Sequence, residues 1–87
     1  MVTVLWAKII KNGKLLRDTV LDVEEFDINE LPEYLKKICY TLDTETPITI
    51  TKHYRNIDNY NIVKFTKDDF VDYIDFDSLV VERSEKE

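Results

Sequence analysis

The dipeptide Asn12-Gly13 lies between two runs of alternating apolar residues, at 2–10 and 14–23. Asparagine and glycine readily adopt the two positive φ angles of a type I′ turn, whose twist matches that of paired strands. The chain is therefore predicted to open with a β-hairpin, and the two-residue turn also sets the pairing of its strands. The predicted register pairs Lys11 with Lys14, Lys8 with Arg17, and Trp6 with Thr19.

Alternation divides the hairpin side chains between two faces, and neither face is polar throughout. The face of Trp6 has the larger apolar volume, so we expect it to join the core. The other face would then expose an apolar patch, which a second copy or a partner normally covers. We therefore predict self-association or a protein partner. The predicted binding residues, two tip lysines included, are Leu5, Ala7, Ile9, Leu16, Val20, Lys11 and Lys14. If the two faces are reversed, the Trp6 face, with its aromatic side chain and two cations, becomes the binding surface.

Residues 31–42 carry apolar side chains at helical spacing, namely Leu31, Leu35, Ile38 and Leu42. This stripe predicts an amphipathic helix. Asp27 with Glu30 resembles a capping box, but that start places Pro32 beyond the first turn, where proline is costly. We therefore prefer Asn29 as the cap, with residues 26–28 as a turn.

The second half alternates strand and helix patterns. Two paired strands are predicted at 47–54 and 60–65. Thr66 and Asp69 are predicted to form the capping box of a two-turn helix. A last strand is predicted at 76–84. The predicted fold is α+β, in the order β-β-α-β-β-α-β, with a mostly antiparallel sheet and one main helix on one face. We expect a single domain at 1–83 and a solvated, disordered tail at 84–87.

A single cysteine, a single histidine and a single glycine limit the possible chemistry. They cannot supply a disulfide, a Cys/His zinc site or a glycine-rich phosphate loop. A nucleophilic pair would need Cys39 and His53, but Cys39 lies beside the helical stripe and is interpreted as a buried hydrophobe. His53 is interpreted as a surface or strand-end residue. We predict no enzymatic activity, no metal and no cofactor.

The first ten residues lack the features of a signal peptide, and no apolar run approaches the roughly 20 residues of a membrane helix. We therefore expect a cytoplasmic protein that does not bind membranes. The residue usage, with frequent Lys, Ile, Asn and Tyr, suggests a bacterial source of low GC content.

Acidic residues gather at 22–33 and 68–77, and the net charge is −6. The second block has no glycine for a calcium-loop turn, and its aromatic residues are expected to face the core, which leaves the acids in water. Rows of carboxylates can also mimic nucleic acid, so an acidic inhibitor of a nucleic-acid-binding protein is the alternative function.

Bases alternate with aromatic residues in the stretch "KHYRN" at 52–56, a pattern that can bind single-stranded nucleic acid. The overall negative charge opposes this, and we predict no direct nucleic-acid binding. Residues 1–17 contain four bases and no acids, whereas the rest carries a net −10 (eight bases against eighteen acids). The lysines keep the hairpin soluble and can steer it towards an acidic surface. The predicted function is a small non-enzymatic binding or regulatory module that works through protein–protein contact.

Overall fold

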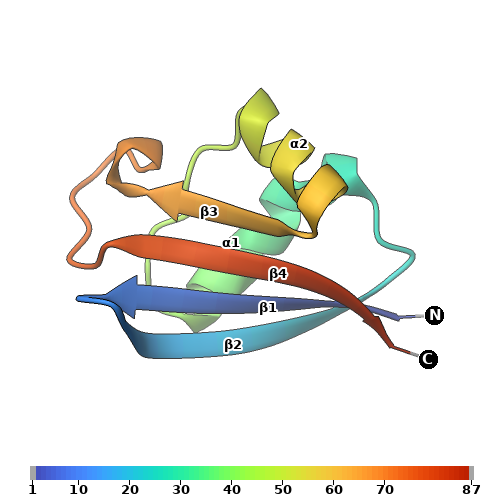
Figure 1. Ribbon diagram of the computed structural model, residues 1–87, viewed down its shortest axis with the longest axis horizontal. Helices are drawn as coiled ribbons and strands as arrows, with labels where there is room; N and C mark the ends of the chain where they lie inside the picture. Colours follow the sequence, from blue (N-terminus) through green and yellow to red (C-terminus); the bar gives the residue numbers. More distant parts are fainter. Residues whose placement is uncertain (1, 87) are drawn as a thin grey trace.

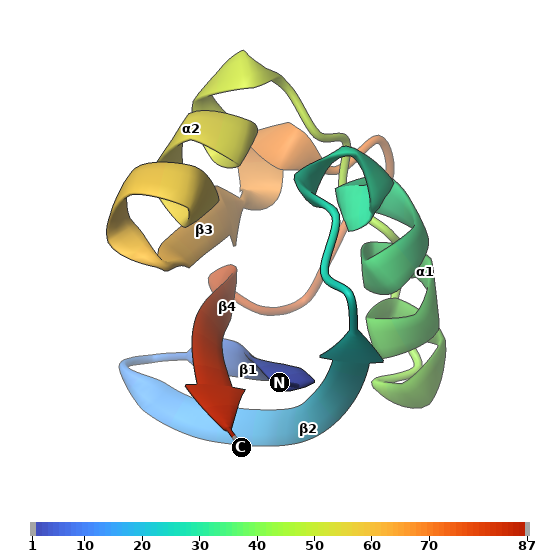
Figure 2. The same ribbon diagram turned by 90° about the vertical axis from the view of Figure 1, so that its right-hand side faces the viewer.

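The computed structural model describes residues 2–86, which form one four-stranded antiparallel sheet in the order β2-β1-β4-β3. Figure 1 shows the strands side by side, and Figure 2 shows the sheet curving around the side on which both helices lie. The α+β class and the antiparallel sheet are thus confirmed. The elements are β1 (Val2–Lys11), β2 (Lys14–Glu24), α1 (Leu31–Thr41), α2 (Thr51–Tyr60), β3 (Ile62–Thr66) and β4 (Ser78–Lys86).

The core lies between the helices and the inner face of the sheet. Leu5, Ala7 and Ile9 of β1 are 0% exposed, whereas Trp6 is 39% exposed. The prediction that the Trp6 face joins the core is therefore wrong. The prediction compared the apolar volume of the two faces within the hairpin alone. The strands β4 and β3 add further apolar side chains to the same face as Leu5. These are Leu79, Val81, Val63 and Phe65.

A β-bulge in the first hairpin explains a second error. The turn itself is as predicted, with Asn12 at φ 54° and Gly13 at φ 75°. The register then shifts, because Ile10 pairs with Leu15 but Ile9 pairs with Arg17, which leaves Leu16 as the extra residue. Beyond the bulge every residue of β2 changes face relative to the predicted register. Lys8 therefore pairs with Asp18, and Trp6 with Val20.

The apolar stripe of α1 is confirmed, since its four residues and Cys39 are buried. The predicted start at Asn29 is wrong. Asp27 caps a short 3₁₀ turn at Ile28–Glu30, where its Oδ1 accepts a hydrogen bond of 3.0 Å from Asn29 N, and α1 continues directly from that turn. Pro32 then falls in the first turn of α1, where its missing N–H costs no hydrogen bond.

The strand predicted at 47–54 is absent, and helix α2 occupies Thr51–Tyr60 instead. Ile48 and Ile50 remain half exposed in an extended segment that pairs with no strand within the described residues. His53 and Ile57, which are one helical turn apart, are both buried. Their burial on one side favours a helix over a strand in this segment. Asn61 ends the helix at φ 61°, in the left-handed conformation typical of a helix terminus.

The end of the chain follows the prediction in part. Thr66 and Asp69 form the predicted capping box, but it begins a single 3₁₀ turn, Lys67–Asp69, and no two-turn helix. The last strand is present and extends through residues 84–86, so the predicted tail is wrong up to that point. Lys86 pairs with Val2, which brings the two ends of the chain together (Figure 1). Glu87 lies outside the described residues.

Candidate binding surface

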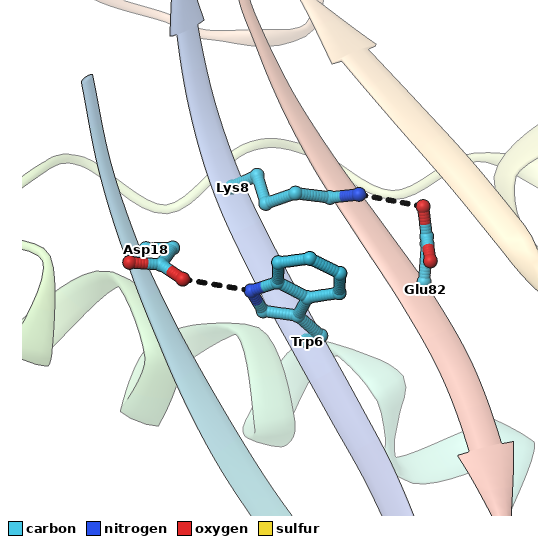
Figure 3. A network of polar contacts seen from close by, with 4 residues as sticks. All are labelled: Trp6, Lys8, Asp18 and Glu82. Carbon is cyan, nitrogen blue, oxygen red and sulfur yellow. Dashed lines mark hydrogen bonds and ion pairs between the residues drawn. The ribbon is translucent and has the colours of Figure 1, made fainter. Parts of the chain in front are cut away.

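The outer face of the sheet points away from both helices. Its side chains alternate with the buried ones, and its most exposed apolar members are Val20 at 55%, Leu15 at 52%, Ile62 at 40% and Trp6 at 39%. Figure 3 looks onto this face, with the helices behind the strands. A sheet with one face in the core and one face open normally places polar side chains on the open one. Here a tryptophan and several aliphatic residues lie among the charged ones.

Three polar contacts hold Trp6 in place at the centre of the outer face (Figure 3). Its indole Nε1 donates a hydrogen bond of 2.9 Å to Asp18 Oδ2. Lys8 Nζ lies 4.2 Å from the centroid of the ring and forms an ion pair of 2.6 Å with Glu82 Oε1. A cation near an exposed ring contributes about 0.5–1 kcal/mol. These contacts fix the orientation of the indole.

Strand pairing arranges the outer face in rows that cross all four strands. Three rows contain one residue from each strand, in the order β2, β1, β4, β3, and the row nearest the hairpin tip is Leu15, Ile10, Ser78 and Thr66. The upper row, as we name it, is Asp18, Lys8, Val80 and Lys64, and the Trp6 row is Val20, Trp6, Glu82 and Ile62. In the upper row, an acid and a lysine therefore stand at opposite edges of the sheet. In the Trp6 row, an aliphatic residue stands at each edge.

The tip of the hairpin forms a second candidate surface. A shallow hollow of about 330 Å³ is lined by Lys11, Asn12, Lys14, Leu15 and Leu16. The tip is anchored to the acidic loop before β4, because Asn12 N donates to Asp77 Oδ2 at 2.8 Å and Asp77 N donates to the Ile10 carbonyl at 2.9 Å. One carboxylate of the acidic block therefore lies beside the basic tip.

The structure separates the predicted binding residues into three places. Leu5, Ala7 and Ile9 are buried in the core, so the exposed patch predicted from them is wrong. Leu16 lies with Lys11 and Lys14 at the hairpin tip. Val20 is exposed, but it lies beside Trp6 on the outer face.

Sequence reasoning left Trp6, Asp18 and Glu82 out of the predicted surface. A signal was present, because Trp6 alternates with Lys8, and a lysine inside a strand is more easily accommodated on an open face.

His53 is buried at 1% exposure, which corrects the interpretation of a surface residue at a strand end. Its Nδ1 accepts a hydrogen bond of 3.0 Å from Ile50 N, and its ring lies 4.5 Å from that of Phe65. Cys39 does not pair with His53, because its thiol is hydrogen-bonded to Thr46. Burial raises the pKa of this thiol to about 11. Since the thiolate is the nucleophilic form, Cys39 is unreactive near neutral pH.

The acidic block at 68–77 forms a loop that is exposed at Asp68, Asp72 and Asp75. Phe70, Ile74 and Phe76 face the core as expected, but Tyr73 is 86% exposed. Among residues 2–86, no three His, Cys, Asp or Glu side chains come together as a metal site would need. The same part of the chain contains no helix of the length and apolar character needed to cross a membrane.

The basic and aromatic stretch at 52–56 lies on α2, not at the end of a strand. Its members therefore point in different directions: Lys52 and Arg55 are exposed, Tyr54 is half buried and His53 faces the core.

Comparisons with protein-family models, with curated proteins and with solved structures find no match to this chain. The fold and the outer face define it as a small α+β domain whose antiparallel sheet has one covered and one open face.

Proposed function

We propose that this protein is a non-enzymatic binding module that acts through protein–protein contact, and that the outer face of the sheet is the contact surface. The observation that supports the proposal is Trp6, the single tryptophan of the chain, held at the centre of an open sheet by Asp18 and Lys8. Tryptophan is enriched among the residues that contribute most to binding, particularly when aliphatic and charged side chains surround it and exclude water.

The size of the face sets the expected affinity. Nine paired residues along β1 and β4, and four strands across, give a footprint of roughly 500 Å² at about 3.3 Å per residue and about 4.8 Å per strand. Stable complexes bury about 800 Å² on each partner. The outer face alone therefore favours a contact of micromolar strength, to which the hairpin tip can add.

Photo-crosslinking in the host cell tests the proposal. A photoreactive amino acid at Val20 lies on the outer face, and the same group at Tyr73 provides a control that is even more exposed but lies on the acidic loop. We expect a protein adduct from position 20 and none from position 73. Equal adducts from both positions, or none from position 20, would contradict the proposal. An adduct to a nucleic-acid-binding enzyme from position 73 alone would favour the acidic-mimic alternative.

A further inference from the structure

We propose that the partner of the outer face is a second copy of this chain, docked in one particular arrangement. A two-fold axis runs parallel to the strands, between β1 and β4, and places β2 of each protomer over β3 of its partner. The inference rests on the proposed function, since it needs the outer face to be a contact surface. It is carried by the order of residues in two of the three rows that cross the sheet, the upper row and the Trp6 row.

The axis reverses the strand order while it keeps each row at its own height. In the upper row, Asp18 then lies over the partner's Lys64. In the Trp6 row, Val20 lies over the partner's Ile62, and these are two of the most exposed aliphatic residues on the face. Each of these contacts occurs twice, because the interface is two-fold symmetric. At the two edges of the sheet, the same operation therefore matches opposite charges in one row and apolar residues in the other. At the centre it places Lys8 over the partner's Val80 and Trp6 over the partner's Glu82.

Charge excludes the other simple face-to-face dimer. An axis across the strands would place β2 over the partner's β2 and β3 over its β3. The outer face of β2 carries three acids, Asp18, Asp22 and Glu24, and no base. Like charges brought together at an interface cost several kcal/mol, so this arrangement is disfavoured.

The charges that the first arrangement pairs are available for it. Among residues 2–86, Lys64 makes no ion pair, and Asp18 makes none either, since its partner is the neutral indole of Trp6. Packed sheets cross at about 30°, which displaces the edge strands by roughly one residue spacing. A lysine side chain can span that displacement. Because the outer face is convex (Figure 2), the same side chain must also bridge the wider gap between the edge strands.

A charge-swap experiment tests both the partner and the arrangement. By analytical ultracentrifugation at low salt, where exposed ion pairs are least screened, we expect wild type to dimerise below 100 µM. Lys64→Glu and Asp18→Lys should each weaken the dimer at least tenfold, because each creates two like-charge contacts. Mixing the two variants should restore wild-type affinity, since every contact in the mixed dimer again joins opposite charges. Lys52→Glu, an exposed change on α2, is the matched control and should leave dimerisation unchanged.

Asp18→Lys also places a second lysine beside Lys8 within one protomer, so its fold is checked by circular dichroism. If it fails to fold, Asp18→Asn replaces it, because the amide oxygen can still accept from Trp6 Nε1. We then expect both Asp18→Asn and Lys64→Glu to dimerise more weakly than wild type. Unchanged affinity in Lys64→Glu, or no recovery on mixing two folded charge-reversed variants, would overturn the arrangement. A monomeric wild type at 100 µM would overturn self-association, whereas an adduct from position 20 to a different protein would leave the proposed function intact.

Discussion

His53 Nε2 lies 3.3 Å from Asp69 Oδ2, and the two side chains are 1% and 8% exposed. Because His53 Nδ1 accepts from Ile50 N, the neutral ring carries its proton on Nε2, the nitrogen nearer to the carboxylate. The two groups lack the alignment of a hydrogen bond. Asp69 Oδ2 also accepts from Thr66 N at 2.9 Å. The pair therefore joins the start of α2 to the turn after β3, two segments that local sequence does not connect.

Replacing His53 should strongly destabilise the fold. His53→Ala removes a buried ring that packs on Phe65, removes the acceptor for Ile50 N and leaves Asp69 buried without its neighbour. We expect a loss of about 2–4 kcal/mol in the free energy of unfolding, measured by urea denaturation. Arg55→Ala, an exposed change on the same helix, is the control and should cost no more than about 0.5 kcal/mol. Equal costs for the two variants would contradict the role of the buried pair.

Cys39 should make stability depend on alkaline pH. Burial raises the pKa of its thiol from 9.0 to about 11, so the folded protein holds this proton more tightly than the unfolded chain does. The contribution of the protonated thiol to the free energy of unfolding is fully present below pH 9. It is lost as the pH rises through about 11, and the total loss is roughly 2–3 kcal/mol. Urea titrations of wild type and Cys39→Ala at a series of pH values should converge across that range. A constant difference between them would show that the thiol does not titrate differently on folding.

Trp6 provides an optical test of the outer face, because it is the single tryptophan. Its ring is 39% exposed in the protomer, and a docked partner would remove water from it. We expect the emission maximum to shift to shorter wavelength, and iodide quenching to decrease, as protein concentration rises from 1 to about 100 µM. Lys64→Glu should show neither change over the same range. A spectrum that is independent of concentration in wild type would mean that no second copy covers Trp6.

Two substitutions on opposite faces of the hairpin test which face is core. Leu5→Ala should cost about 2–5 kcal/mol, because Leu5 is 0% exposed and its truncation leaves a cavity. Val20→Ser, at a position that is 55% exposed, should change stability far less. Thermal unfolding of both variants, at a protein concentration where sedimentation detects only monomer, separates the two effects. A larger loss of stability for Val20→Ser than for Leu5→Ala would show that the Trp6 face is the buried one.

The features that the sequence determined by itself are those whose interactions are local. Asn12-Gly13 forms its turn because both residues accept positive φ angles wherever the chain goes. The stripe of α1 is buried as predicted, because its apolar residues repeat at the period of the helix. The capping box of Thr66 and Asp69 closes over three residues. These elements give the α+β class and the presence of a first hairpin, a main helix and a last strand.

The binding surface was decided by tertiary structure. Both faces of the hairpin are apolar enough to be buried. The choice between them depends on β4, which pairs with β1, and on β3, which pairs with β4, and both strands are far from β1 in the sequence. The bulge at Leu16 then moves Val20 to the side of Trp6. Residues 48–51 have the alternation of a strand, but His53 gains a buried place against Phe65 and Asp69 only as part of a helix. In each case local preferences are nearly balanced, and contacts between distant segments select the outcome.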